Sequence, residues 1–208
     1  FKILKSKASN SIYDWSKFEH KITNNSVTTT SDSISGTSVQ AMVFDASGDK
    51  LDLGSHRSFN ILKGDFSLDF WIKLDNVSGE QQILKKEGVV EVKKTSNSEI
   101  QFKIKNKIIK SSALSGSWAH VAVSARFNRV SRYMDLSLFV NGEKESTISE
   151  IEFNELSNRN ENSLIIGEGL RGRLYGVRLY VGRSLFDANF KPSITLEKEE
   201  IKRAYKLL

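Results

Sequence analysis

The sequence predicts an all-β protein, a two-sheet antiparallel β-sandwich with a short C-terminal helix. Three observations support this fold class. Apolar and polar side chains alternate over many short segments, which is the pattern of half-buried strands. Turn-forming residues separate those segments at short intervals. Helical periodicity occurs only after the single proline, Pro192. A chain of 208 residues, of which 38% are hydrophobic, can bury the core of one such domain.

The first segment, residues 1–38, is expected to be an N-terminal arm that carries the first strand of the sandwich. Its long polar stretch, NNSVTTTSDSISGTS, suits either an edge strand or a flexible segment. From Val39 onward the strand pattern becomes dense. The strongest strand is predicted in GDFSLDFWIKL, where every second side chain from Phe66 to Leu74 is apolar. Trp71 points to the opposite side of that strand, beside Asp69 and Lys73.

The segment Gly116–Gly142 predicts a β-hairpin. Alternate apolar residues from Ala119 to Ala125 share one face of its first strand, and those from Leu136 to Val140 share one face of its second. Asn141-Gly142 is the dipeptide that most readily adopts the positive φ values of a tight turn. A slip of one residue would expose the apolar face, so the register of these strands is well specified.

Short strands are also expected in QQILKK, VVEVKK, EIQFKI, KIIKSS, STISEIEF, SLIIGEG and GRLYGVRLYV. In the last of these, Leu174, Val177, Leu179 and Val181 are the predicted core residues. About a dozen short strands without helical segments between them indicate a sandwich or jelly roll. The sandwich is expected over residues 39–192. Residues 193–208 form a predicted helical extension, because LEKEEIKRAYKLL has apolar residues at three-to-four spacing, early acids and late bases.

Composition excludes several classes of function. The chain has no cysteine, so it has no disulfides, thiolate metal sites or cysteine nucleophiles. The net charge of +6 is spread along the chain, and we expect no nucleic-acid partner. The densest lysine group, FKIKNKIIK, is read as a solvated outer strand or, less simply, as a patch for polyanions. No apolar run is long enough to predict membrane insertion.

Several segments, in order, resemble the concanavalin A-like, laminin-G-like jelly-roll domains: GDFSLDFWIK, GSWAHVAVSA, LSLFVNGE and GRLYGVRLYVGRSLFDANFKPS. The ending GRSLFDANFKP is similar to the version of this domain in tailed-phage virion proteins. That resemblance implies a tail-fibre, appendage or capsid-decoration module that works in multiple copies among other virion subunits. It also implies location on a phage particle or another extracellular surface, and binding of a cell-surface glycan or polysaccharide.

The resemblance does not extend to a cofactor. Many relatives carry an acidic pair in the final strand, and here Tyr175 and Gly176 fill those positions, which disfavours calcium. Asp45, Asp49 and Asp52 are read as turn-forming residues. His20, His56 and His120 lack metal-ligand spacing, so the sequence predicts no metal site and no cofactor.

An enzymatic alternative depends on the acids Glu150, Glu152 and Glu155. Glycanases that share this fold use a strand of the form Glu-x-Asp-x-x-Glu, and retaining hydrolysis needs two carboxyl groups about 5–5.5 Å apart. Glu152 replaces the central Asp, and the surrounding segment lacks the aromatic residues of a sugar cleft. We therefore expect no enzymatic activity, with a glycoside hydrolase as the less favoured alternative.

Aromatic and arginine side chains are the expected ligand-binding residues. Sugars stack their C–H faces on rings, and arginines bind carboxylated or sulfated sugars through paired hydrogen bonds. The candidates are Trp71, Tyr133, Arg171, Arg173, Tyr175 and Arg178. If these side chains are covered, they serve packing or subunit contacts. The chain would then be a structural decoration or assembly protein without sugar binding.

Overall fold

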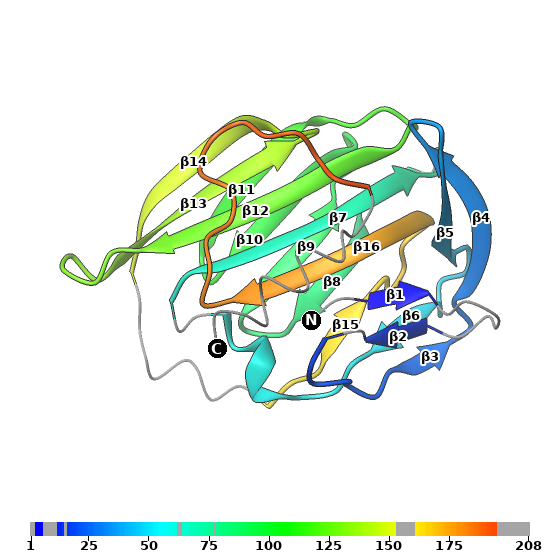
Figure 1. Ribbon diagram of the computed structural model, residues 1–208, viewed down its shortest axis with the longest axis horizontal. Helices are drawn as coiled ribbons and strands as arrows, with labels where there is room; N and C mark the ends of the chain where they lie inside the picture. The colour runs from blue at the N-terminus through cyan, green and yellow to red at the C-terminus, as the bar shows by residue number, and fades with distance from the viewer. Residues whose placement is uncertain are drawn as a thin grey trace.

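The alternating segments form two antiparallel seven-stranded sheets that pack face to face, as the sequence predicts (Figure 1). The computed structural model describes residues 3–5, 12–14, 16–61, 64–76, 78–152 and 161–194. The predicted helix over residues 196–208 lies outside this part of the chain. Within the described part, no helix has the length and apolar character needed to cross a membrane.

Sheet I has the strand order β14-β13-β12-β7-β16-β5-β4. Its strands in chain order are β4 (Thr28–Ile34), β5 (Thr37–Phe44), β7 (Phe66–Leu74), β12 (Ala119–Phe127), β13 (Tyr133–Val140), β14 (Glu143–Glu152) and β16 (Gly172–Val181). β16 pairs with both β5 and β7, so the last strand of the chain to enter this sheet lies near its middle.

Sheet II has the order β11-β10-β9-β8-β15-β6-β3. Its strands are β3 (Thr23–Asn25), β6 (Lys50–Asp52), β8 (Gln81–Lys86), β9 (Val90–Lys94), β10 (Glu99–Ile104), β11 (Lys107–Ala113) and β15 (Leu164–Ile166). A short separate sheet pairs β1 (Ile3–Lys5) with β2 (Ile12–Asp14), and a 3₁₀ turn, η1, spans Arg57–Phe59.

The core lies between the inner faces of the two sheets. Alternate residues of β7 point inward, and Phe66 stacks against Phe102 of β10 with the ring centroids 6.3 Å apart. Phe44 of β5 and Ile104 of β10 have no exposed surface at all. Burial of apolar area on this scale supplies most of the stability of a sandwich.

The predicted hairpin is confirmed, because β12 pairs with β13 in the expected register, with Val123 opposite Leu138. Asn141 and Gly142 have φ values of 51° and 85° and form the tight turn between β13 and β14. The polar stretch near the N-terminus is ordered, and its residues 28–34 form the edge strand β4. One core prediction is wrong: Val181 is 40% exposed, because β16 ends there and the chain leaves the sheet.

After β16, residues 182–194 run back over the outer face of sheet I without regular secondary structure; we call this segment the strap. Figure 1 shows its orange to red trace crossing in front of the strands. The Phe186 and Phe190 rings stack on each other at 4.5 Å, and both lie against Phe139 of β13. The strap gives sheet I a second hydrophobic layer outside the core.

Candidate functional site

Four of the predicted ligand-binding residues, Trp71, Arg173, Tyr175 and Arg178, lie on the outer face of sheet I. Gly176 has a φ of 62°, and the register of β16 against β7 shifts between Tyr175 and Arg178. This bulge places both Tyr175 and Arg178 on the outer face, where they lie opposite Trp71 and Asp69 of β7. Simple alternation along the sequence would have put these two side chains on opposite faces.

The strap and its neighbours cover the rings of this group. Trp71 is only 8% exposed and packs with Ile34 and Val39. Its Nε1 donates to the Ser193 carbonyl at 3.4 Å, and the Tyr175 hydroxyl donates to the Ile194 carbonyl at 3.3 Å. Burial raises the pKa of Tyr175. The Trp71 ring is therefore used for packing, and a sugar would have to displace the strap to stack on it.

Arg178 is engaged in a buried ionic cluster with Asp69 and His120. Its Nε donates to Asp69 Oδ2 at 2.8 Å, its Nη2 contacts the same oxygen, and His120 Nε2 lies 3.0 Å from that oxygen. The three residues are 6%, 0% and 1% exposed, in the order Arg178, Asp69, His120. His120 is thus a hydrogen-bonded residue of the sheet. In this geometry Arg178 neutralises an internal carboxylate and is not presented to an external one.

Arg173 and Arg171 lie near the other end of sheet I. Arg173 pairs with Asp32 of the edge strand β4, and Lys73 Nζ lies 3.3 Å from the same carboxylate. Desolvation alone would raise the pKa of Asp32, but the Ser33 backbone N–H, Arg173 and Lys73 together lower it to about 2. The exposed Arg171 donates to the Asp45 carbonyl, and its backbone N–H bonds Gln81. The structure therefore does not gather the six predicted residues into one patch.

Tyr133 lies far along the sheet, at the tip of the β12–β13 hairpin, and is 42% exposed. This tip extends beyond the body of the sandwich in Figure 1. Its exposed side chains include three arginines that the sequence analysis did not select: Arg126, Arg129 and Arg132. Their density in RFNRVSRY next to a tyrosine was the signal that could have identified them. We call residues 126–133 the arginine tip.

The arginine tip is held in a defined conformation by Asn128. The Asn128 side-chain oxygen accepts hydrogen bonds from the backbone of Val130 at 2.9 Å and of Ser131 at 3.2 Å. Its backbone N–H and carbonyl pair with Tyr133 and Arg132 at 2.8 and 2.9 Å. A loop ordered in this way loses less conformational entropy when a ligand binds. Val130, 95% exposed, stands at its apex.

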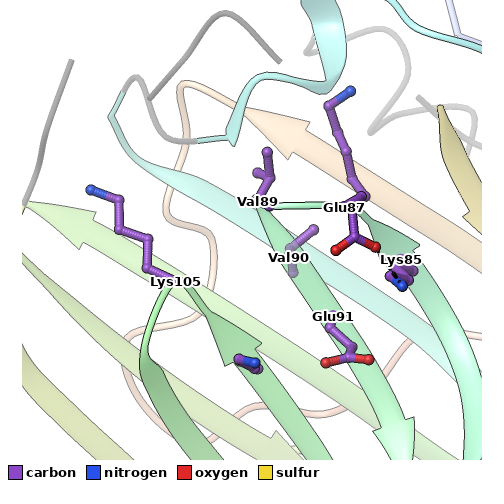
Figure 2. A pocket seen from close by; sticks show the side chains of 9 residues that line it. Lys85, Glu87, Val89, Val90, Glu91 and Lys105 are labelled. Atoms are coloured by element: carbon purple, nitrogen blue, oxygen red, sulfur yellow. Dashed lines mark ion pairs between the residues drawn. The ribbon is translucent and has the colours of Figure 1, made fainter. Parts of the chain in front are cut away.

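Lysines line a pocket of about 140 Å³ on sheet II, between the β8–β9 turn and β10. Figure 2 shows Lys85, Glu87, Glu91 and Lys105 around it. Lys85 pairs with Glu87 at 2.5 Å, and Lys105 donates to the Glu152 carbonyl at 3.1 Å. Along the chain, Phe102 and Ile104 alternate with Lys103 and Lys105. The two apolar side chains are fully buried and the two lysines reach solvent, so the prediction of a solvated outer strand is confirmed. The paired charges make this pocket a weaker anion site than the arginine tip.

The acidic residues that the sequence singled out, where the structure describes them, lie on an edge strand or in turns. Glu150 and Glu152 are exposed on the edge strand β14, and Glu155 lies outside the described residues. The Asp49 carboxylate accepts the backbone N–H groups of Asp45 and Ala46, and Asp52 accepts that of Gly54, so both shape turns. In the part of the chain that the structure covers, no group of three or more His, Cys, Asp or Glu side chains could hold a metal ion.

Solved structures with a similar fold include binding domains of botulinum neurotoxins. The binding domain of botulinum neurotoxin DC, in complex with SialylT, is 14% identical with a TM-score of 0.66, and the match covers 99% of this chain and 50% of that one. A botulinum neurotoxin type C structure is 15% identical with a TM-score of 0.62, covering 100% and 50%. The chain thus spans about half the length of these toxin domains. At these identities the likeness shows the fold alone.

The botulinum neurotoxin serotype C1 binding domain is also similar, at 17% identity and a TM-score of 0.61, over 88% of this chain and 48% of that one. No curated protein is significantly similar in sequence. The resemblance of residues 182–192 to phage virion proteins stays a prediction. The similar structures named here are toxin domains and do not test it. A family model described as the concanavalin A-like lectin/glucanases superfamily matches residues 45–183. That match covers the strands from β6 to β16, and the chain belongs to the concanavalin A-like lectin and glucanase superfamily.

Proposed function

We propose that this protein is a non-catalytic module that binds an acidic glycan through the arginine tip. The observation that carries the proposal is the exposure of Arg126, Arg129 and Tyr133 at the ordered end of one hairpin. An arginine fork matches the two oxygens of a sugar carboxylate, and a tyrosine ring offers a face for the C–H groups of the sugar. Loops held by a rigid sheet are the usual place for such recognition.

The comparisons support a glycan as the partner without identifying it. One similar toxin domain is in complex with SialylT, and another comes from a toxin whose uptake into cells depends on interaction with two ganglioside molecules. The exposure of Glu150 and Glu152 on an edge strand supports a role without catalysis. Of the residues selected from sequence, Tyr133 belongs to the proposed site. Trp71, Arg173, Tyr175 and Arg178 are engaged elsewhere, and Arg171 lies apart.

The proposal includes an extracellular setting, on the exterior of a phage particle or of another surface, with other subunits of that particle as partners. A single small loop contacts few sugar atoms and binds weakly. Display in several copies would raise the apparent affinity by about 10²–10⁴-fold without any new contact. The oligomeric state of the purified chain, measured by light scattering, tests this part separately from sugar binding.

A glycan array that includes sialylated and other acidic oligosaccharides tests the binding site. Arg129→Ala and Tyr133→Ala should each weaken binding of the best acidic ligand by about tenfold or more, because each removes a charge-assisted bond or a stacking face. Arg183→Ala is the matched control for loss of one exposed positive charge, and Lys103→Ala tests the lysine pocket.

Equal losses in Arg129→Ala and Arg183→Ala would mean that only net charge matters and would sink the arginine tip as a site. A selective loss in Lys103→Ala would move the site to sheet II. No binding to any acidic glycan would favour the structural alternative, a decoration or assembly protein.

A further inference from the structure

His20 and His56, which are 36 residues apart in sequence, meet beside η1. His20 follows β2, and His56 is the N-cap of η1. His20 Nε2 lies 3.1 Å from His56 Nδ1. The Ser58 hydroxyl oxygen lies 2.8 Å from the first nitrogen and 2.9 Å from the second. Three side-chain donor atoms from separate residues therefore converge on one point, which the isolated histidines of the sequence did not suggest.

A buried carboxylate behind His20 decides which ring nitrogen carries the hydrogen. The Asp14 side chain has no exposed surface and contacts His20 Nδ1. The backbone N–H groups of Ser16 and His20 donate to the same carboxylate at 2.8 and 3.0 Å. With Nδ1–H donated to Asp14, the neutral His20 ring directs the Nε2 lone pair away from Asp14.

The second ring also carries its lone pair on the nitrogen nearest this point. The Ser58 backbone N–H donates to His56 Nδ1 at 3.2 Å, so that nitrogen is an acceptor, and a bound cation would take the place of this N–H. The single hydroxyl hydrogen of Ser58 can be donated to only one of the two imidazole nitrogens at a time. The rings are held against Phe59, with the His20 centroid 4.5 Å away and the two imidazole centroids 4.7 Å apart. The arrangement suits a cation shared by both rings.

We propose that His20 Nε2 and His56 Nδ1 bind a divalent transition metal of the Zn²⁺ class, with Ser58 Oγ as the third donor and water completing the coordination. At a metal–nitrogen distance of about 2.0–2.1 Å, a nitrogen separation of 3.1 Å corresponds to an N–metal–N angle of about 100°. This lies between the octahedral and tetrahedral angles. The pairing of Asp14 with His20 Nδ1 is the carboxylate–histidine arrangement that increases the basicity of a metal-binding imidazole.

The site is independent of the proposed glycan function, since it lies between the segment after β2 and the start of η1 and not on the arginine tip. Imidazole nitrogens select Zn²⁺, Ni²⁺ or Cu²⁺, whereas Ca²⁺ and Mg²⁺ require oxygen ligands. His56 is exposed, so its ring gives access from solvent. A proton is the competing occupant of the space between the rings. Asp14 behind His20, and Lys17, Glu19 and Arg57 on the flanking segments, are the neighbouring charged groups.

The test is a titration of the whole chain, without an affinity tag and after chelator treatment, with Zn²⁺ at pH 7.5 by calorimetry. We expect one Zn²⁺ per chain and no heat with Mg²⁺. His56→Ala should weaken Zn²⁺ binding at least tenfold, and since its side chain is exposed, this variant should fold. Ser55→Ala, which alters an exposed neighbour, is the control. Lowering the pH to 5.5 should weaken binding by about 10- to 100-fold, because ordinary imidazoles are protonated there.

Imidazole ¹⁵N resonances distinguish the metal from the proton. Zn²⁺ should shift His20 Nε2 and His56 Nδ1 at constant pH and leave His120 unchanged. The proposal is overturned if the resonances respond to pH alone, or if His56→Ala binds Zn²⁺ as tightly as the natural chain. Asp14→Asn, if it folds, should weaken binding by about 10- to 100-fold, which is typical for loss of a carboxylate behind a metal ligand.

Discussion

The outer faces of the two sheets differ although both strand sets alternate in the same way. On sheet I, most outward residues of β7 and β12 are buried: Ser67, Asp69, Trp71, His120, Ala122 and Ser124. Lys73 and Arg126, near the ends of these strands, reach solvent. On sheet II, the outward residues of β8, β9 and β10 are Lys85, Glu91 and Lys103, which lie side by side in register and meet solvent. The covered face uses aromatic rings, small side chains and one paired charge cluster. The open face uses lysines and glutamates, several of which form ion pairs at the surface.

The difference follows from the strap, whose backbone needs short polar side chains as hydrogen-bond partners on the sheet beneath it. The Ser67 hydroxyl accepts the Leu185 N–H at 2.8 Å and donates to the Arg183 carbonyl at 3.1 Å. Ser124 accepts the Phe186 N–H at 3.2 Å. An irregular segment leaves its backbone groups without a ladder, so short hydroxyl side chains on the sheet satisfy them. Lysines in those positions would have to bury charge.

The largest expected effect comes from the buried cluster on the covered face. Asp69→Asn keeps the shape of the side chain but leaves the Arg178 charge without its carboxylate. We expect a loss of about 3–5 kcal/mol in the free energy of unfolding, measured by urea denaturation. Glu91→Gln on the open face should change it by less than about 0.5 kcal/mol. A loss below about 1 kcal/mol for Asp69→Asn would mean that water reaches the cluster under the strap.

A smaller effect is expected at the turn that holds the strap. A Cβ at Gly142 would overlap the Phe190 carbonyl oxygen, and its φ is +85°. We expect Gly142→Ala to cost about 2–4 kcal/mol through strain and displacement of the strap. Trp71 fluorescence should shift to the red as Ser193 and its neighbours move away. Gly36 has a similar φ of +82°, but a Cβ there would meet no atom within 4 Å. Gly36→Ala therefore measures the cost of backbone strain alone, about 1–2 kcal/mol. Equal costs would show that the strap does not depend on this contact.

The smallest effect concerns the exposed edge of sheet I, where Asp32 pairs with Arg173 and Lys73. The pKa of Asp32 is lowered from 3.8 to about 2, so its ion pairs stabilise the fold above pH 4. That contribution is lost as the pH falls through 2, because the carboxyl then takes up a proton. Asp32→Asn should therefore cost up to about 1 kcal/mol at pH 5 and almost nothing at pH 2. Asp135→Asn, on exposed β13 surface, is the control, and a pH-independent cost for Asp32→Asn would contradict the pairing.

The sequence predicted the parts of the fold that depend on local alternation. The inner residues of β7 and β12, the hairpin register and the Asn141-Gly142 turn all follow from period two and turn chemistry. It did not predict which segment covers Trp71, because the strap begins more than a hundred residues later. The bulge at Gly176 was not predicted, so the sequence did not show that Tyr175 and Arg178 share one face of the sheet.

The same limit applies to the functional surfaces. Tyr133 was selected from its residue type, and the structure adds the exposure of the arginines around it. His20 and His56 are separate in the sequence and meet only because η1 packs beside the segment after β2. Such clusters depend on long-range packing, which residue spacing along a chain does not encode.

The central place of β16 in sheet I has a consequence for how the chain folds. β16 is inserted between β5 and β7, so those two strands have no partner on that side until residues 172–181 have been synthesised. Contacts between such distant segments slow folding, and sandwiches of this kind fold in roughly milliseconds to seconds. During synthesis on the ribosome, the edges of β5 and β7 would remain open to pairing with other chains, and shortening that interval should reduce aggregation.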